Sequence, residues 1–156
     1  MDARIVALAL TLLAGCAAPP DFVTCHGVAF YLQGTSAFTR EQAELLEHDF
    51  LRRLDDATAL HGPARERCLQ VTRVVVTPEP FSCSADPDRT CAGEQYGPTL
   101  KIAARDCPFQ SAYVHELLHW LQECSEGLLD YAHESPAWTV VNAQLEEART
   151  WCAEPE

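Results

Sequence analysis

The spacing of hydrophobic residues predicts a chain in which short strands alternate with amphipathic helices. The segment Gly27–Leu32 places every second apolar side chain on one side, which is the period of a strand with one buried face. Thr39 and Gln42 match a capping box, in which each side chain satisfies a backbone amide at the start of a helix. Apolar residues keep helical spacing from there to the stop at Gly62–Pro63: Ala43, Leu46, Phe50, Leu54 and Ala57.

Later segments predict the rest of the sheet and a last helix. Leu69–Val76 is rich in β-branched residues, and Thr99–Ala103 reads as a second short strand. We interpret Gly93–Pro98 as a turn, and Thr99–Ala103 either as a sheet edge that receives an extended substrate or as an ordinary strand. Ser135–Pro136 starts the final helix. We therefore expect an α+β domain, in which a small, mostly antiparallel sheet packs on an N-terminal helix, a central helix and a C-terminal helix.

The central helix carries the most specific chemical signal, an H-E-x-x-H motif at 115–119. Residues four apart share one face of a helix, so His115 and His119 can bind one metal ion while Glu116 lies beside them. An apolar stripe follows another face of the same helix: Val114, Leu117, Leu118 and Leu121. The motif is that of zinc peptidases. It predicts a Zn²⁺ site with Glu116 as the general base that takes a proton from a metal-activated water.

A catalytic zinc site needs a third protein ligand, and the sequence offers several candidates. His133 lies 14 residues after His119, on the connection before the final helix. Glu146 and Glu147 are alternatives from that helix, although a helical wheel places both away from its buried stripe. Glu134 is a weaker candidate of the same kind. We favour His133 because imidazole suits zinc and a connecting loop can fold back onto the central helix.

The stretch from His133 to Trp138 resembles the third-ligand region of SprT-like zincins, where a histidine precedes a turn and an aromatic residue at the head of the next helix. The resemblance covers about residues 111–140, and Glu134 stands where a glycine usually follows the histidine. It implies a minimal zincin-like fold and a metallopeptidase that acts on a peptide or protein substrate. Tyr131, two residues before His133, is our candidate for a further oxyanion donor.

The first residues predict export and lipidation. Arg4 followed by the apolar run Ile5–Leu13 is typical of a signal peptide and too short for a permanent transmembrane helix. The residues Leu13-Ala14-Gly15-Cys16 resemble the lipobox of bacterial lipoproteins. That resemblance implies cleavage before Cys16 and acylation of the cysteine, and Ala17 after it implies sorting to the outer membrane in Gram-negative members.

These segments divide the chain into three parts. We expect a lipoprotein signal peptide over 1–15, a lipidated tether over 16–24 and a zincin-like metallopeptidase domain over 25–156. The mature protein would be lipid-anchored at the bacterial cell envelope, on the outer membrane, and would face the periplasm or the cell surface.

An exported chain with eight cysteines is expected to form disulfides. Cys83 and Cys91 flank a turn-rich loop that can bring them together, so we predict that they pair. With Cys16 assigned to the lipid, seven cysteines remain. Because seven is odd, at most three intramolecular bridges can form and one thiol is left over.

The other pairings depend on how the last two helices meet. A final helix that folds back antiparallel on the central helix brings Cys152 toward Cys107, which favours a bridge between them. Cys25 then pairs with Cys68 by elimination. Cys124 is left as the spare thiol, because it lies too far along the central helix from Cys107 to bond with it.

The net charge of the chain argues against two classes of partner. The chain has a formal net charge of −12, which makes it a poor partner for nucleic acid and for anionic lipid headgroups. Any membrane contact is therefore expected to come from the lipid on Cys16. The alternative to a peptidase is a non-catalytic, disulfide-stapled envelope lipoprotein that acts as a binding or structural module.

Overall fold

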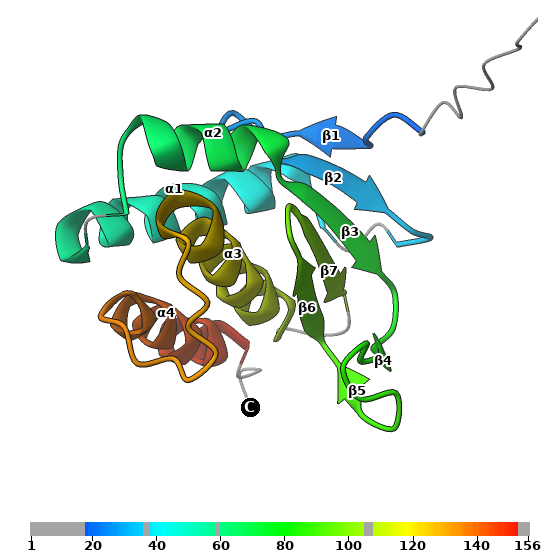
Figure 1. The fold of residues 1–156 in the computed structure, drawn as a ribbon. Coiled ribbons are helices and arrows are strands. Elements are labelled where there is room, and N and C mark those ends of the chain that lie inside the picture. Colours follow the sequence, from blue (N-terminus) through cyan, green and yellow to red (C-terminus); the bar gives the residue numbers. More distant parts are fainter. Residues whose placement is uncertain (1–17, 36–37, 59, 105–107, 153–156) are drawn as a thin grey trace, which may run out of the picture.

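The structure is a computed structural model that describes residues 18–35, 38–58, 60–104 and 108–152, with side chains undescribed for 108–111 and 145–152. It has an α+β architecture in which helices gather on one side of a mixed sheet (Figure 1). The helices are α1 (Arg40–Ala57), α2 (Pro63–Val71), α3 (Pro108–Glu126) and α4 (Ala137–Cys152). The predicted signal peptide and Cys16 lie outside the described residues.

The main sheet has five strands in the order β1-β2-β3-β7-β6. They are β1 (Phe22–Val23), β2 (Ala29–Leu32), β3 (Arg73–Thr77), β7 (Thr99–Ala103) and β6 (Gly93–Tyr96). A separate hairpin joins β4 (Phe81–Ser82) to β5 (Thr90–Cys91).

The expectation of a mostly antiparallel sheet is wrong. Strand β3 runs parallel to both of its neighbours, β2 and β7, and only the outer pairs β1–β2 and β6–β7 are antiparallel. The connection from β2 to β3 passes through α1 and α2, and a helical crossover of this kind returns the chain in the same direction. Thr99–Ala103 is an interior strand. The edge is β6, in the segment that we expected to be a turn.

Helix α1 forms as its sequence predicts. Thr39 accepts from the backbone amide of Gln42, and the Gln42 side chain accepts from the amide of Thr39, which completes the capping box. The segment after it differs from the prediction, because Pro63 begins helix α2 and the strand expected at Leu69 starts only at Arg73. Proline fits the first turn of a helix, where its missing N–H has no intrahelical partner.

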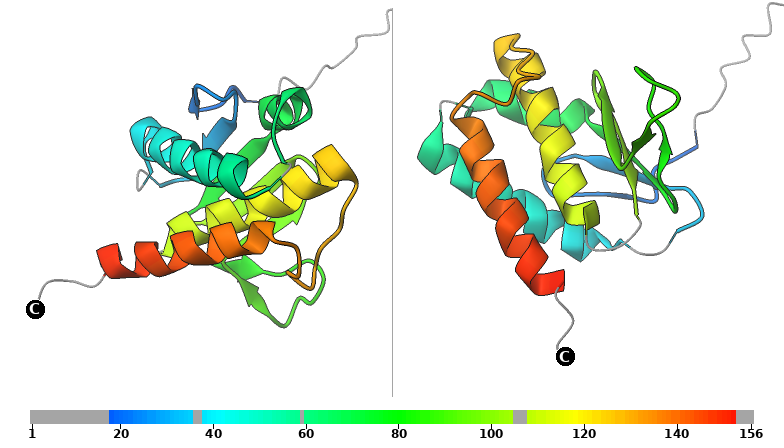
Figure 2. Two further views of the ribbon diagram at one scale, coloured as in Figure 1. Left: turned by 90° about the vertical axis from the view of Figure 1, so that its left-hand side faces the viewer. Right: turned by 90° about the horizontal axis from the view of Figure 1, so that it is seen from below.

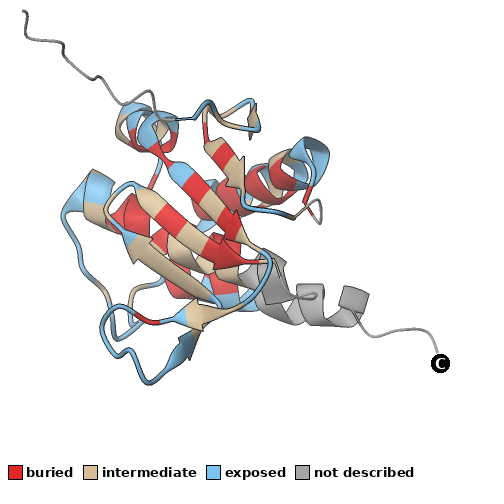
Figure 3. Ribbon diagram, turned by 90° about the vertical axis from the view of Figure 1, so that its right-hand side faces the viewer, coloured by how far each residue is buried: buried red, intermediate tan, exposed pale blue. Residues whose placement is uncertain are grey.

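One hydrophobic core lies between the sheet and the helices. Strands β2, β3 and β7 each turn alternate residues toward the helices, among them Phe30, Val74 and Leu100, all fully buried. From the helices, Phe50 of α1 and Leu117 of α3 fill the space facing them. Figure 3 shows the resulting stripes of buried and partly exposed residues along the strands, seen from the side that no helix covers.

Helix α4 packs against α3 and α1 and runs antiparallel to α3, as predicted (Figure 2). The ten residues 127–136 connect the two helices. This connection carries His133 back toward the middle of α3, so the fold determines where the third predicted ligand lies.

Two disulfides join described residues. Cys83 and Cys91 pair as predicted. Cys68 pairs with Cys124, with Cα atoms 6.0 Å apart, so the predicted Cys25–Cys68 bridge and the spare role for Cys124 are both wrong. The reason is α2, which carries Cys68 to the end of α3. Cys25 is a free, exposed thiol.

The predicted Cys107–Cys152 bridge involves side chains outside the described part of the structure. The two bridges that are described indicate an oxidising compartment outside the cytoplasm. Among the described helices, none is long and apolar enough to cross a membrane.

Candidate metal centre

Helix α3 presents His115 and His119 on one face because its other face is committed to the core. Val114, Leu117 and Leu118 are at most 1 % exposed and anchor the helix on the sheet. The two imidazoles lie one turn apart on the face that remains, with ring centroids separated by 5.0 Å, and both are partly buried.

His133 completes the cluster from the connection before α4. Its Nε2 lies 3.2 Å from Nε2 of His119, and one nitrogen from each of the three histidines lies within 4.8 Å of the other two. Nitrogens bound at about 2.0–2.1 Å to a tetrahedral zinc ion are separated by about 3.3–3.4 Å. The 3.2 Å between His119 and His133 matches this separation, and the wider pairs, within 4.8 Å, would need a small movement of the rings to bind one ion.

The protonation state of the two histidines on α3 suits a cation. Burial, together with the other two histidines, lowers the pKa of His115 to about 4. Burial and the neighbouring His133 lower the pKa of His119 to about 4 as well. Both rings are neutral at pH 7 and offer lone pairs. A single shared N–H can link only two of three converging rings, whereas a metal ion accepts a lone pair from each, so these residues could hold one.

Asp130 organises the loop that carries His133. Its Oδ1 accepts from the backbone amide of Glu134 at 3.1 Å, and its Oδ2 accepts from the amide of Ser135 at 2.8 Å and from the indole Nε1 of Trp138 at 3.0 Å. The bond from Ser135, followed by that from Glu134, lowers the pKa of Asp130 to about 2. A single carboxylate thus fixes the turn and the first residues of α4.

Trp138 and the backbone of His133 complete this arrangement. The indole of Trp138 is 2 % exposed, and its ring centroids lie within 4.8 Å of His115, 4.7 Å of His119 and 4.0 Å of His133. His133 has φ 59°, the left-handed region that residues with a Cβ rarely adopt. Strain of this kind persists where surrounding contacts determine it and is typical of functional sites.

Glu116 projects between α3 and the edge strand β6. A Cβ added to Gly93 of β6 would lie 2.8 Å from Oε1 and 2.9 Å from Cγ of Glu116, so only glycine leaves room for the carboxyl group in this place. Burial, and to a smaller degree the nearby Glu94, raises the pKa of Glu116 to about 7. A carboxyl group with such a pKa can exchange a proton near neutral pH.

The remaining candidates lie in less defined positions. Tyr131 is 71 % exposed, and its ring centroid is 6.0 Å from that of His119, so it is near the cluster without packing against it. Glu134 is exposed and is no member of the metal-ligating cluster found among the described residues. The side chains of Glu146 and Glu147 lie outside the description.

Sequence reasoning missed three residues that shape the site: Gly93, Asp130 and Trp138. Trp138 was expected as the aromatic residue at the head of the last helix, with no contact to the histidines assigned to it, and Gly93 was placed in a turn. Nothing in the sequence singled out Asp130. Its hydrogen bonds to the Glu134 and Ser135 amides and to the Trp138 indole exist only once the loop is folded, so they could not be predicted from the sequence. Comparisons with family models, with curated proteins and with solved structures found no match. The function of the centre is therefore inferred from its own residues.

Proposed function

We propose that the protein is an envelope-anchored, zinc-dependent metallopeptidase. The observation that carries the proposal is the convergence of His115, His119 and His133, together with Glu116, the residue after His115, whose carboxyl group lies against a strand at the edge of the sheet. Three imidazoles are the ligand set of catalytic zinc sites that keep a fourth position open. When bound, zinc would polarise a carbonyl group and lower the pKa of a coordinated water to about 7.

Each residue of the site would have a separate role in hydrolysis. The three histidines hold the metal, and Trp138 keeps their rings in place by packing against all of them. Glu116 acts as the general base and later as the acid, because its raised pKa allows it both to take and to return a proton. Tyr131 remains our candidate for donating a hydrogen bond to the oxyanion.

The edge strand β6 supports a peptide as the substrate. It ends the sheet order, so one side of its backbone has no partner strand among the described residues, and Gly93 at its start touches the Glu116 side chain. An extended peptide that pairs with β6 would thus pass along the general base. Such binding uses backbone groups, which every peptide offers.

The same proposal includes the anchor at Cys16 and a location at the bacterial envelope, probed by mass spectrometry of the mature N-terminus. Two disulfides agree with export. The lipid attachment and the outer-membrane location follow from the Leu13–Cys16 resemblance.

Metal content tests the ligand assignment. We expect one zinc per chain in the mature protein after dialysis against limiting zinc, and loss of tight binding in His133→Ala. His48→Ala, which removes an exposed histidine of α1 distant in sequence from the cluster, is the matched control and should bind like the wild type. Unchanged zinc affinity in His133→Ala would contradict the three-histidine site.

Hydrolysis tests the activity separately. Glu116→Gln should keep its zinc and lose turnover of the peptides that the wild-type protein cleaves, since Glu116 serves as a base and not as a ligand. A zinc-loaded wild-type protein that cleaves no member of a diverse peptide library would favour the non-catalytic binding module instead.

A further inference from the structure

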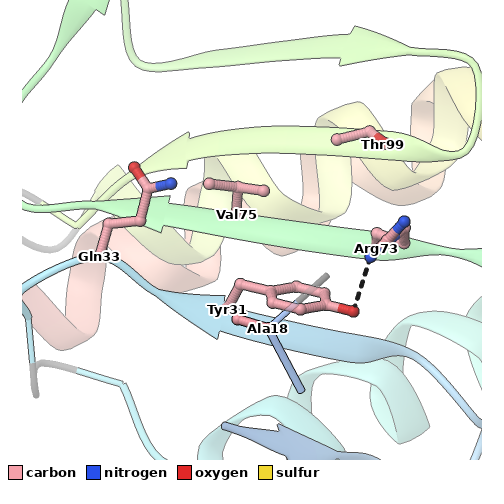
Figure 4. Close-up of a pocket in the computed structure, with 6 residues that line it drawn as sticks. All are labelled: Ala18, Tyr31, Gln33, Arg73, Val75 and Thr99. Carbon is pink, nitrogen blue, oxygen red and sulfur yellow. Dashed lines mark hydrogen bonds between the residues drawn. The ribbon is translucent and has the colours of Figure 1, made fainter. Parts of the chain in front are cut away.

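The face of the sheet that no helix covers contains a shallow hollow. Side chains from β2, β3 and β7, from the residue after β2 and from the start of the described chain line it (Figure 4): Ala18, Tyr31, Gln33, Arg73, Val75 and Thr99. Its volume is about 340 Å³. Arg73 donates to the Tyr31 hydroxyl at 2.9 Å and lies 5.1 Å from the centre of that ring. The floor of the hollow is therefore an amphipathic surface with one guanidinium.

Residues 21–23, within the expected tether, are bound to this sheet. Asp21 donates its amide to the Phe30 carbonyl at 2.8 Å, and its carboxylate accepts from the Leu32 amide at 2.6 Å. Phe22 stacks on Phe30 with ring centroids 4.7 Å apart. Strand β1, at residues 22–23, thus belongs to the sheet.

This attachment leaves little chain between the domain and the predicted lipid. Ala18 already lines the hollow, and only Ala17 separates it from Cys16. A residue spans at most about 3.6 Å, so Cα of Cys16 can lie no more than roughly 7 Å from Cα of Ala18. A lipid on Cys16 would hold the open face of the sheet next to the headgroups.

The hollow itself carries one charge, and it is positive. The chain as a whole is strongly acidic, yet the lining of the hollow includes Arg73 and no carboxylate. One carboxylate of the same face, that of Glu94, lies opposite Lys101 in the β6–β7 register and accepts hydrogen bonds from the Ser84 amide and the Tyr96 hydroxyl. Lys101 lies on the same face, because it is opposite Val75 in the β3–β7 register, and its Nζ is 3.9 Å from the centre of the Phe81 ring. Arginine and lysine beside aromatic rings are suited to the phosphate layer of a bilayer.

We propose that this open face, centred on Arg73 and Lys101, rests on the phosphate layer of the membrane that holds the Cys16 lipid. The proposal depends on lipidation of Cys16 and is independent of peptidase activity. In this orientation the helices, which lie on the opposite side of the sheet, face the aqueous phase (Figure 2). The histidine cluster on α3 would then remain open to substrates in solution.

The composition of the chain provides a specific test, because Lys101 is its only lysine. Full-length protein is lipidated in a bacterial host and placed on phosphatidylcholine vesicles that contain phosphatidylglycerol. A water-soluble amine-reactive reagent then labels Lys101. All proteins carry Arg52→Lys, which puts a reference amine on α1 at a position with a 56 % exposed side chain. Mass spectrometry measures the ratio of the two labelling rates and the acylation of Cys16.

A variant with ten Gly and Ser residues inserted after Ala17 is the matched control, because it keeps the lipid and releases the domain from the surface. We expect the ratio of Lys101 to reference labelling to be roughly five-fold lower without the insert than with it. Equal ratios in the two proteins, or an unmodified Cys16, would overturn the proposal. Arg73→Gln should raise the ratio in the protein without the insert, and an unchanged ratio would overturn the phosphate contact.

Discussion

A buried carboxyl group in the core makes a quantitative prediction about stability. Glu47 of α1 is 0 % exposed, and its Oε1 accepts a hydrogen bond of 2.6 Å from the hydroxyl of Tyr113 on α3. Its Oε2 is buried without a hydrogen bond. Burial raises the pKa of Glu47 from 4.5 to about 7, although the bond from Tyr113 works in the opposite direction. Ionised Glu47 is therefore unfavourable in the folded protein.

The sign of the pH dependence follows from the raised pKa. The folded state holds the Glu47 proton more tightly than the unfolded state does, so this contribution to stability is complete below about pH 4.5 and is lost as the pH rises through about 7. A difference of about 2.5 pKa units, at 1.36 kcal/mol each, amounts to roughly 3 kcal/mol.

Urea denaturation between pH 4.5 and 8 measures the effect as a difference between the wild type and Glu47→Gln. Glutamine keeps an acceptor for Tyr113 and cannot ionise. A chelator in the buffer prevents metal binding from contributing to the measured stability. His115 and His119 have lowered pKa values, which stabilise the folded state as the pH rises through about 4 to 6.5. This contribution is the same in the wild type and in Glu47→Gln, so it cancels when the two free energies of unfolding are subtracted. Glu126→Gln, at an exposed position of α3, controls for the loss of one carboxylate.

We expect Glu47→Gln to gain roughly 3 kcal/mol relative to the wild type between the two ends of this pH range. A difference in the free energy of unfolding that stays constant within about 0.5 kcal/mol across the range would refute the buried, proton-binding role of Glu47. A loss of stability in Glu47→Gln that grows with pH would refute the sign.

Three further changes test the site and its support. Gly93→Ala should displace the Glu116 carboxyl group by about half an ångström and lower kcat roughly tenfold at unchanged zinc affinity, measured by peptide hydrolysis and metal titration. Asp130→Asn replaces an acceptor of the His133 loop and should weaken zinc binding by roughly 10- to 100-fold in competition with a chelator. Cys124→Ser opens a bridge between residues 56 apart and should cost roughly 4 kcal/mol in urea denaturation.

Features encoded over short stretches of sequence could be predicted. The capping box at Thr39 involves residues three apart, and the Cys83–Cys91 bridge closes a loop of eight residues. The H-E-x-x-H spacing places two imidazoles on one helical face whatever the rest of the fold does. The position of His133 beside them was a hypothesis from loop length and ligand type, and the structure brings the three rings together.

Features that depend on how distant segments meet could not be predicted. Pro63 was taken as the stop of one helix, although proline equally begins the next, and this one choice left Cys68 just before an expected strand and outside any helix. The wrong partner for Cys68 follows from the missing helix. The parallel direction of β3 follows from the helical crossover between β2 and β3, of which only α1 was predicted. Strand direction depends on the crossover, which no residue of β3 itself specifies.

The construction of the metal centre explains why its ligands were easier to find than its supports. Metal chemistry admits few residue types, so His115, His119 and His133 stand out in the sequence. The residues that hold the ligands in place, Asp130 and Trp138, need only the right shape and one hydrogen-bond acceptor, which many residue types can provide. His133 is held in a left-handed conformation, and Asp130 opposes that cost by accepting three hydrogen bonds within the loop and from Trp138, which in turn packs on every imidazole.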